Sequence, residues 1–442
     1  MKFHQFIIAA VFITLIVPVT VPADEHQDKN IEGVSPQVRI ISPGPGMYNN
    51  IYGEVPYMDP ASRYVIYLKL GQQGDLKTGD WQAYCDAEIW RADLETGKTQ
   101  RVEERALGMR CMAVSPDNKY FYYSKPLDLA QDKSYNNIDC MDAEVKQFVR
   151  LDITTLEKHN IDLHGSALHL TSMGSVTVDN RYLIDGVSLG DGLYGIAKID
   201  LQSGQVKVIL EGRPGIYNSH PQVDPKRGQD LMIQYDRSCI VEQGKLIKQK
   251  TGLGITLFLI DLQGQNYRPL PVGKPVTDPV QGHQCWLGRT GHILFTTIGS
   301  METKAEQGNI FTIGPGDTKP KAIARGYMYW HCNSSRDGRF FVADTRHGPI
   351  RAIGGRSAND PRRYIHQPIE YESLIVVGSV ATGKTRILCP SKATCRKPQY
   401  THPHPYFSPD SKWVIFDTDE DGLPKVAAAR VPDGLLAELD KK

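Results

Sequence analysis

The chain of 442 residues has almost no net charge, because its 51 basic residues are matched by 50 acidic ones and leave a formal charge of +1. This balance lacks the basic excess that is typical of nucleic-acid-binding proteins, so no nucleic-acid partner is expected. Long apolar runs are also scarce, and beyond the N-terminus no segment is apolar enough to span a membrane. Amphipathic helical periodicity is almost absent, which disfavours an α/β fold.

The N-terminus has the features of a secretory signal peptide. Lys2 gives it a positive start, an apolar run extends from Phe6 to Val17, and a small residue, Ala23, follows. The run is shorter than the ~20 residues of a spanning helix, so a membrane anchor is the weaker alternative. We therefore expect residues 1–23 to be a signal peptide, and the mature chain to be periplasmic or secreted without stable membrane insertion. The eight cysteines could form disulfides there, but the sequence does not reveal their pairing.

One pattern of turn and strand returns seven times along the chain. A turn rich in Asp, Asn, Gly or Pro precedes an aromatic or β-branched run, as in "SPDNKYFYYSK" from Ser115 and "SPDSKWVIFDTD" from Ser408. A second hairpin follows, as in "IWRADLETGKTQRV" from Ile89. Two hairpins make the four antiparallel strands of a propeller blade. We therefore predict an all-β fold in which residues 24–442 form a single seven-bladed β-propeller domain with four-stranded blades.

The segment "GSVATGKT" at Gly378–Thr385 matches a complete phosphate-binding pattern. Such a loop works only between a strand and a helix, whereas the following "TRILCP" has the character of a strand. "LETGKT" at Leu94–Thr99 is a near copy in the corresponding hairpin of another repeat. We interpret both segments as β-turns and expect no nucleotide ligand.

Histidines recur before the turn in four consecutive repeats, at His220, His283, His331, and the pair His402 and His404. Because the innermost strand of a propeller blade lines its channel, we expect these imidazoles to converge. Neutral imidazole is the commonest metal ligand and also suits proton transfer near neutral pH. A histidine cluster that only stabilises the channel is the alternative.

The spacing of these residues bears on the metal. Side chains two apart on a strand share a face, so His402 and His404 could bind one ion, whereas Gln399 needs a loop or bulge to join them. Imidazole and amide ligands favour Mn²⁺ or a similar divalent ion. Cys285 and Cys332, close in sequence to the histidines, keep Zn²⁺ open, and Ca²⁺ is a further alternative.

The run "QYTHPHPYFSPDSKWVIFDTDEDG" from Gln399 closely resembles the C-terminal region of oligogalacturonate lyases, polysaccharide lyase family 22. "GHQCWLGRTGHILFTT", "HCNSSRDGRFFVADT" and "SHPQVDP" resemble other segments of that family, and the likeness covers the last half of the chain better than the first. The resemblance implies a seven-bladed propeller that cleaves uronic-acid oligosaccharides by β-elimination. It further implies a manganese ion bound by His283, Gln399, His402 and His404, with His220 as the catalytic base.

The chain departs from the family pattern in two places. Where the family has an active-site arginine, "LYGIAKIDLQSG" offers Lys198 as a second catalytic candidate, and the family's early His-Arg pair is missing at "GPGMYNNIYG". The candidates for substrate binding are His331, Arg346, Arg237 and Tyr217. Tyr217 and Tyr235 are also candidates for protonating the leaving oxygen.

Two other functions remain open on the sequence. One is a lyase for another acidic polysaccharide such as ulvan, which the absence of histidine between His26 and His159 disfavours. The other is an exported, non-catalytic propeller that binds a glycan or a protein and whose histidines hold a structural ion. For any propeller, we expect "QVRIIS" near Gln37 to pair with "KVAAARV" in the last repeat.

Overall fold

The computed structural model describes residues 37–75, 80–108, 112–125, 144–165, 168–298, 308–345, 373–395 and 399–442. The expected signal peptide, residues 1–23, lies outside the described residues. The helices of the described part are short, namely η1 (Pro214–Ile216), η3 (Gln399–Thr401) and α2 (Leu435–Leu439). The prediction of an all-β fold is therefore confirmed. None of the described helices is long and apolar enough to cross a membrane.

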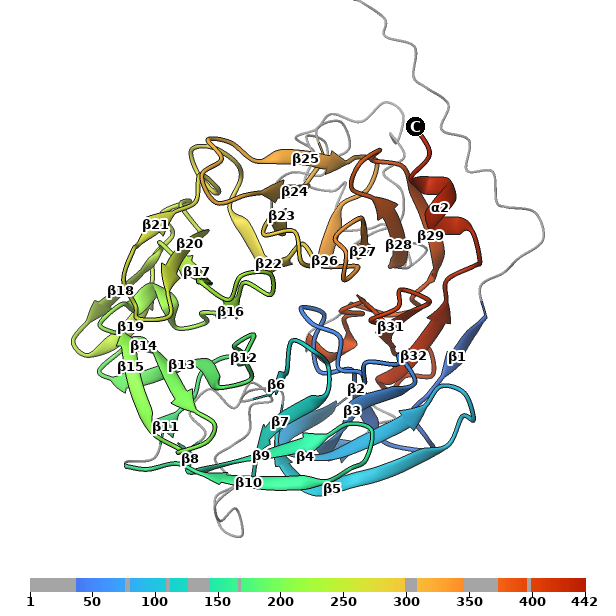
Figure 1. Cartoon of the computed structure of the whole chain (residues 1–442), viewed down its shortest axis with the longest axis horizontal. Coiled ribbons are helices and arrows are strands. Elements are labelled where there is room, and N and C mark those ends of the chain that lie inside the picture. Colours follow the sequence, from blue (N-terminus) through green and yellow to red (C-terminus); the bar gives the residue numbers. More distant parts are fainter. Residues whose placement is uncertain are drawn as a thin grey trace, which may run out of the picture. The chain divides into compact units, whose positions relative to one another are not determined.

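Most strands form four-stranded antiparallel sheets that follow one another in chain order (Figure 1). In the four sheets given next, the strands lie side by side in the same order in which they occur along the chain. These sheets contain β2 (Met47–Asn49), β3 (Tyr64–Asp75), β4 (Asp80–Asp93) and β5 (Thr99–Leu107); β6 (Ala113–Val114), β7 (Tyr120–Ser124), β9 (Gln147–Asp152) and β10 (Lys158–Asp162); β12 (Ser175–Val176), β13 (Tyr182–Gly190), β14 (Leu193–Asp200) and β15 (Val206–Leu210); and β26 (Tyr329–Ser334), β27 (Phe340–Thr345), β28 (Leu374–Ser379) and β29 (Thr385–Pro390).

An eight-stranded sheet lies between the third and fourth of these in the chain. It consists of two groups of four strands, joined through the single pair Ile255–Val280. The groups are β16 (Gln222–Val223), β17 (Asp230–Asp236), β20 (Ile255–Asp261) and β21 (Arg268–Pro269), and β22 (Val280–Trp286), β23 (Ile293–Thr297), β24 (Ile310–Ile313) and β25 (Lys321–Ala324). Two small sheets pair β8 (Glu144–Val145) with β11 (Leu168–His169), and β18 (Cys239–Glu242) with β19 (Lys245–Lys248).

The first and last described strands meet in one sheet. β30 (Tyr406–Phe407), β31 (Trp413–Thr418) and β32 (Lys425–Arg430) are completed by β1 (Val38–Ile40), in which Val38 pairs with Ala429. The predicted pairing of the segment near Gln37 with "KVAAARV" is confirmed.

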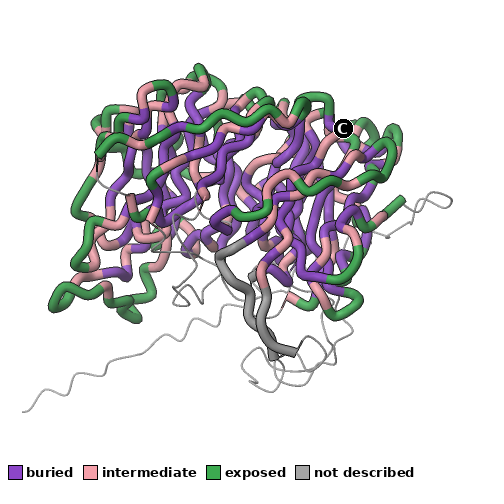
Figure 2. The backbone as a smooth tube through the Cα atoms, turned by 90° about the horizontal axis from the view of Figure 1, so that it is seen from below, coloured by how far each residue is buried: buried purple, intermediate pink, exposed green. Residues whose placement is uncertain are grey.

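Buried side chains fill the spaces between consecutive sheets. Alternate residues of a strand point to opposite faces, so in β27 Phe340 and Val342 pack toward the sheet of β31, while Phe341 and Ala343 pack toward that of β22. One cluster also joins the last sheet to the first, through residues such as Tyr406. Both faces of the sheets are thus covered, and Figure 2 shows buried backbone along the strands and exposed backbone in the connections.

Side-chain hydrogen bonds explain why the repeated motif forms tight turns. In "SPDN" the Ser115 hydroxyl donates to the carboxylate two residues on and accepts the backbone N–H of Tyr120. Asn118 then adopts a positive φ of 65°, which asparagine tolerates better than most residues. The same two bonds recur at Ser335 and Ser408. The repeat is therefore a self-capped turn that reverses the chain between the first two strands of a sheet.

"GSVATGKT" forms the second kind of hairpin turn. β28 ends at Ser379, whose hydroxyl accepts two backbone N–H groups of the turn, and Gly383 has a φ of 72° before β29 begins at Thr385. At "LETGKT" the carboxylate of Asp93 accepts two N–H groups and Gly97 has a φ of 70°. Because a strand rather than a helix follows the glycine, the predicted β-turn is confirmed.

Candidate active site

Five imidazoles from four of the four-stranded groups lie close together. His283 belongs to β22 and His331 to β26, His220 precedes β16, and His402 and His404 lie between η3 and β30. The ring centroid of His331 is 4.0 Å from those of His283 and His404, and 5.5 Å from that of His402. We call these residues the imidazole cluster.

Tyr52 lies against four of these rings. Its ring centroid is 4.5 Å from that of His404, 5.6 Å from that of His220, 6.2 Å from that of His283 and 6.5 Å from that of His331. Only 4% of Tyr52 is exposed. The cluster is therefore largely shielded from bulk water on the side that this ring covers.

Three of the imidazoles are placed to share a cation. Nitrogen atoms of His331, His402 and His404 lie within 4.8 Å of one another. In the described part, Nε2 of His331 and both ring nitrogens of His404 are buried without a hydrogen-bond partner. An unsatisfied buried polar atom costs about 1–3 kcal/mol, and a divalent cation would remove that cost for the nitrogens that bind it. The donor set therefore fits a metal ion.

The electrostatics keep these rings uncharged. Burial lowers the pKa of His283, His331 and His404 well below the usual value, and neighbouring imidazoles lower the same pKa values further. The rings are therefore neutral at neutral pH, which is the state in which imidazole binds a metal.

Hydrogen bonds on Nδ1 orient two of the rings. Nδ1 of His331 is 2.7 Å from Oδ2 of Asp344, whose Oδ1 accepts the backbone N–H of the same histidine. Burial raises the pKa of Asp344 to about 7. Nδ1 of His283 is 2.9 Å from the hydroxyl of Tyr52. A partner on Nδ1 leaves Nε2 available, as is usual for histidines that bind metals.

His220 has a different partner, a carboxylate. Its Nδ1 is 2.6 Å from Oε1 of Glu54, and the side chains are 4% and 8% exposed. The backbone N–H of His220 donates to the hydroxyl of Ser172, and the residue has a positive φ of 40°. A carboxylate can only accept a hydrogen bond, so at this contact Nδ1 carries the ring proton and the free lone pair is on Nε2.

Buried hydrogen bonds hold the segment that carries Tyr52 and Glu54. Asn49 Nδ2 and the backbone N–H of Asn50 donate to the two carboxylate oxygens of Asp417, at 2.7 and 2.9 Å. Asn50 Nδ2 donates to the backbone oxygen of His404 at 2.9 Å. A Cβ at Gly53 would come within 3.0 Å of the same oxygen, so the close approach requires glycine.

Sequence reasoning missed Tyr52, Glu54 and Asp344. The first two lie in "NNIYGE", which has no strand periodicity, and the contacts of this segment to Asp417 and His220 span 367 and 166 residues of the chain. The paired asparagines and the glycine are the signal in the sequence of a specifically bonded turn. Asp344 is on a regular strand, and only its complete burial marks it as unusual.

The geometry around His402 differs from the expectation. His402 and His404 follow η3 in irregular structure, and His404 has a positive φ of 43°, so alternation along a strand does not set the orientation of their side chains. Their ring centroids are nevertheless 5.7 Å apart. Gln399 lies in η3 rather than on a strand, and its side chain is outside the described part.

The other predicted site residues lie elsewhere or are not described. Nζ of Lys198 donates to the backbone oxygen of Leu262 and lies 4.8 Å from the Tyr182 ring centroid, so the structure does not bring it to the cluster. Arg237 donates to two backbone oxygens, those of Lys274 and Leu253. The ring of Tyr217 contacts Tyr194. Arg346 lies outside the described residues.

The cysteines near the cluster belong to the core. Cys285 and Cys332 are buried free thiols in the apolar cluster between the sheets of β22 and β26. Burial raises the pKa of the Cys332 thiol well above its usual value, and its Sγ donates to the backbone oxygen of His283. Among the described residues, neither cysteine belongs to the group whose ligand atoms lie close enough to share an ion.

Comparison with known proteins identifies homologues with one activity. The chain is 22% identical over 421 residues to an oligogalacturonate lyase of Dickeya dadantii, covering 90% of this chain and 94% of the relative. It is 24% identical over 248 residues to an oligogalacturonide lyase of Pectobacterium atrosepticum, covering 54% and 56%. No protein-family model matches the chain.

Solved structures give the same result for the fold. An oligogalacturonate lyase from Vibrio parahaemolyticus superposes with a TM-score of 0.61 at 15% identity, and an oligogalacturonate lyase in complex with manganese with 0.60 at 16%. Each comparison covers 90% of this chain and 94% of the other. The resemblance noted in the sequence is therefore confirmed over most of the chain.

Proposed function

We propose that the protein is an exported, metal-dependent polysaccharide lyase that cleaves short uronic-acid oligosaccharides of the oligogalacturonate type by β-elimination. The observation that carries the proposal is the Glu54–His220 pair within an imidazole cluster that has unsatisfied buried nitrogens. The homologues support the substrate class, and the manganese complex of one of them supports Mn²⁺.

The proposal includes a seven-bladed β-propeller as the scaffold. Seven groups of four strands, core clusters between consecutive groups, and completion of the last sheet by β1 support it. In that architecture the first strand of every blade faces a common axis, which accounts for imidazoles from four of the four-stranded groups in one cluster.

In the proposed site, His331, His402 and His404 hold the divalent ion, with His283 and Gln399 as further ligands. When bound, the ion supplies Lewis-acid stabilisation of the negative charge that develops beside the substrate carboxylate. This reading adds His331 to the ligands expected from the sequence, because its Nε2 is one of the unsatisfied nitrogens.

His220 is the base of the proposed reaction. Its Nε2 accepts the proton from C5 of the uronate, and the electrons of that C–H bond form the C4–C5 double bond as the C4–O bond breaks. Glu54 keeps the proton of the neutral ring on Nδ1 and stabilises the imidazolium that forms. Because both side chains are over nine-tenths buried, their attraction is stronger than it is in water.

Tyr52 is the proposed acid. The Tyr52 hydroxyl lies 2.9 Å from Nδ1 of His283, and when that nitrogen carries the ring proton the phenol oxygen accepts its hydrogen bond while the O–H acts as a donor. That hydroxyl then protonates the departing O4. Tyr52 replaces Tyr217 and Tyr235 in this role because its ring lies against His220 and His283.

The test combines metal analysis with a substrate panel. The purified mature protein should retain a divalent ion and give the ultraviolet absorbance of a 4,5-unsaturated product from tri-galacturonate. His220→Ala should abolish product and keep the metal, and His404→Ala should lose both. His159→Ala, at an exposed position on β10, is the matched control.

Each contrary result has a definite meaning. Loss of metal together with activity in His220→Ala would make His220 a ligand rather than the base. Product from ulvan or another acidic polysaccharide alone would change the substrate class. A metal-loaded protein that yields no product from any uronate would be a binding propeller.

A further inference from the structure

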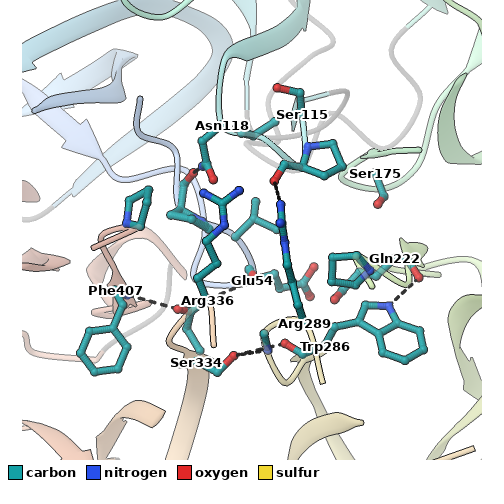
Figure 3. Close-up of a pocket in the computed structure, with 18 of the residues that line it drawn as sticks. Glu54, Ser115, Asn118, Ser175, Gln222, Trp286, Arg289, Ser334, Arg336 and Phe407 are labelled. Atoms are coloured by element: carbon teal, nitrogen blue, oxygen red, sulfur yellow. Dashed lines mark hydrogen bonds between the residues drawn. The ribbon is translucent and has the colours of Figure 1, made fainter. Parts of the chain in front are cut away.

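A cavity of about 140 Å³ lies at the ends of the first strands of the four-stranded groups (Figure 3). Residues at or beside β6, β12, β16, β22, β26 and β30 line it, together with Glu54 and its neighbours. None of the five imidazoles is among its lining residues. It is therefore distinct from the metal centre, although Glu54 borders both.

Two arginines project into this cavity from adjacent turns. Arg336 occupies the position that is proline in the equivalent turns, Pro116 and Pro409. The backbone N–H of Arg289 donates to the backbone oxygen of Arg336, which ties the two turns together. Figure 3 shows both guanidinium groups pointing into the same space.

The positive charge of this pair has no dedicated partner. Nη2 of Arg289 donates to the backbone oxygen of Pro116, and within the described residues Arg336 makes no side-chain hydrogen bond or ion pair. Burial lowers the pKa of Arg336, and the charge of Arg289 lowers the same pKa further.

The nearby carboxylates already have hydrogen-bond partners. Glu54 pairs with His220, and Asp117 accepts hydrogen bonds from Ser115, Lys119 and Asn180. The Coulombic attraction of Asp117 only partly offsets the positive potential at Arg336. An external anion would therefore gain two guanidinium partners without displacing an existing ion pair.

The walls and the size restrict the ligand. Val114, Val176 and Val223, with several prolines, give the cavity an apolar wall that suits a ligand with a carbon skeleton. Its volume is below the about 300–1,000 Å³ of pockets that bind drug-sized molecules. A guanidinium fork matches the planar geometry of a carboxylate.

We propose that Arg289 and Arg336 form a binding site for a small organic carboxylate, no larger than one acidic sugar. The site is separate from the proposed lyase centre, and its occupancy does not depend on that activity. The probes are succinate and galacturonic acid, with sulfate and phosphate as inorganic anions of similar charge.

Calorimetric titration of the full mature chain tests the proposal. One equivalent of a carboxylate probe should bind, more tightly than sulfate or phosphate. Arg336→Gln and Arg289→Gln should each weaken binding about ten- to a hundred-fold, the loss expected for a charge-assisted hydrogen bond. Arg227→Gln, an exposed arginine in the equivalent turn before β17, is the matched control and should bind as the parent does.

Two further variants separate this site from the metal centre. His404→Ala should keep the carboxylate affinity, and Arg336→Lys should bind more weakly than the parent but more tightly than Arg336→Gln, because it keeps the charge without the fork. Should Arg336→Gln fail to fold, Arg289→Gln, altered at an exposed side chain, still decides the question. Equal affinity for all four anions, unchanged binding in both glutamine variants, no binding, or loss of binding in His404→Ala would overturn the proposal.

Discussion

Replacement of Glu54 by glutamine addresses the pair at the centre of the proposed reaction. The change keeps the size of the side chain but removes its charge, and it introduces an N–H₂ donor opposite Nδ1 of His220. Donation from that amide would favour the tautomer with the proton on Nε2, which has no lone pair for the C5 proton. The variant should therefore lose activity through the base rather than through the metal.

The magnitude follows from the contact itself. Oε1 of Glu54 and Nδ1 of His220 are 2.6 Å apart, and both side chains are over nine-tenths buried. Their hydrogen bond therefore belongs to the charge-assisted class, which contributes about 1.5–3 kcal/mol. Each 1.36 kcal/mol changes a rate tenfold. We expect kcat to fall about 10- to 200-fold from the lost charge, and further if the tautomer changes.

Initial rates of unsaturated-product formation from tri-galacturonate, measured with metal content, provide the assay. KM should stay within about threefold and the ion should be retained, since Glu54 is not among the candidate ligands. Glu104→Gln, at an exposed position, controls for loss of a carboxylate. A Glu54→Gln enzyme with the parent kcat would refute the reasoning, and so would one that lost its metal in proportion to its activity.

Three other perturbations have definite outcomes. Removal of the ion by a chelator should lower the melting temperature of the parent protein. The chelator should have little effect on His404→Ala, because this variant lacks two of the unsatisfied nitrogens. Calorimetry of both proteins with and without the chelator provides the measurement. Burial alone would raise the pKa of Glu103, but hydrogen bonds from Tyr123 and two lysines lower it to about 2. About 2 kcal/mol of stability that is present above pH ~4.5 should therefore disappear as the pH falls toward 2. Glu103→Gln should make stability less dependent on pH in this acid range in denaturant titrations, and an unchanged dependence would contradict the assignment. Gly378→Ala should destabilise by about 1–3 kcal/mol, because its Cβ would lie 2.5 Å from the ring of Phe341. Lys384→Ala, in the exposed part of the same turn, should change stability by less than about 0.5 kcal/mol in the same thermal denaturation.

The fold was predictable to the extent that local chemistry determines it. The turn of Ser115 and the turn that ends at Gly383 are fixed by hydrogen bonds and positive φ angles within a few residues, so the sequence identifies both. Similar turns, repeated seven times along the chain, predict four-stranded antiparallel sheets. Pairing of β1 with β32 was predictable as well, because both segments have strand character and the predicted propeller requires its last sheet to be completed by the first segment of the chain.

The site was predictable only where its residues belong to the repeat. His283 and His331 lie on the first strands of their four-stranded groups, and their positions before the turns reveal them. Tyr52 and Glu54 are in irregular structure, oriented by Asp417 and His220 from distant parts of the chain, and no local pattern encodes such contacts. Lys198 shows the converse, because its position in the sequence suggested a place in the site, whereas its Nζ donates to the backbone oxygen of Leu262 away from the cluster.

The joining of β1 to β32 also bears on when the protein can mature during synthesis. A ribosome makes β1 long before β32, and the Asn49–Asp417 contact likewise unites early and late segments. The nascent chain therefore cannot lock Tyr52 and Glu54 beside His404 until nearly all of it has emerged. We therefore expect the candidate site to assemble only when synthesis is nearly complete, and a truncated translation product to carry most of the imidazoles without the contacts that position Tyr52 and Glu54.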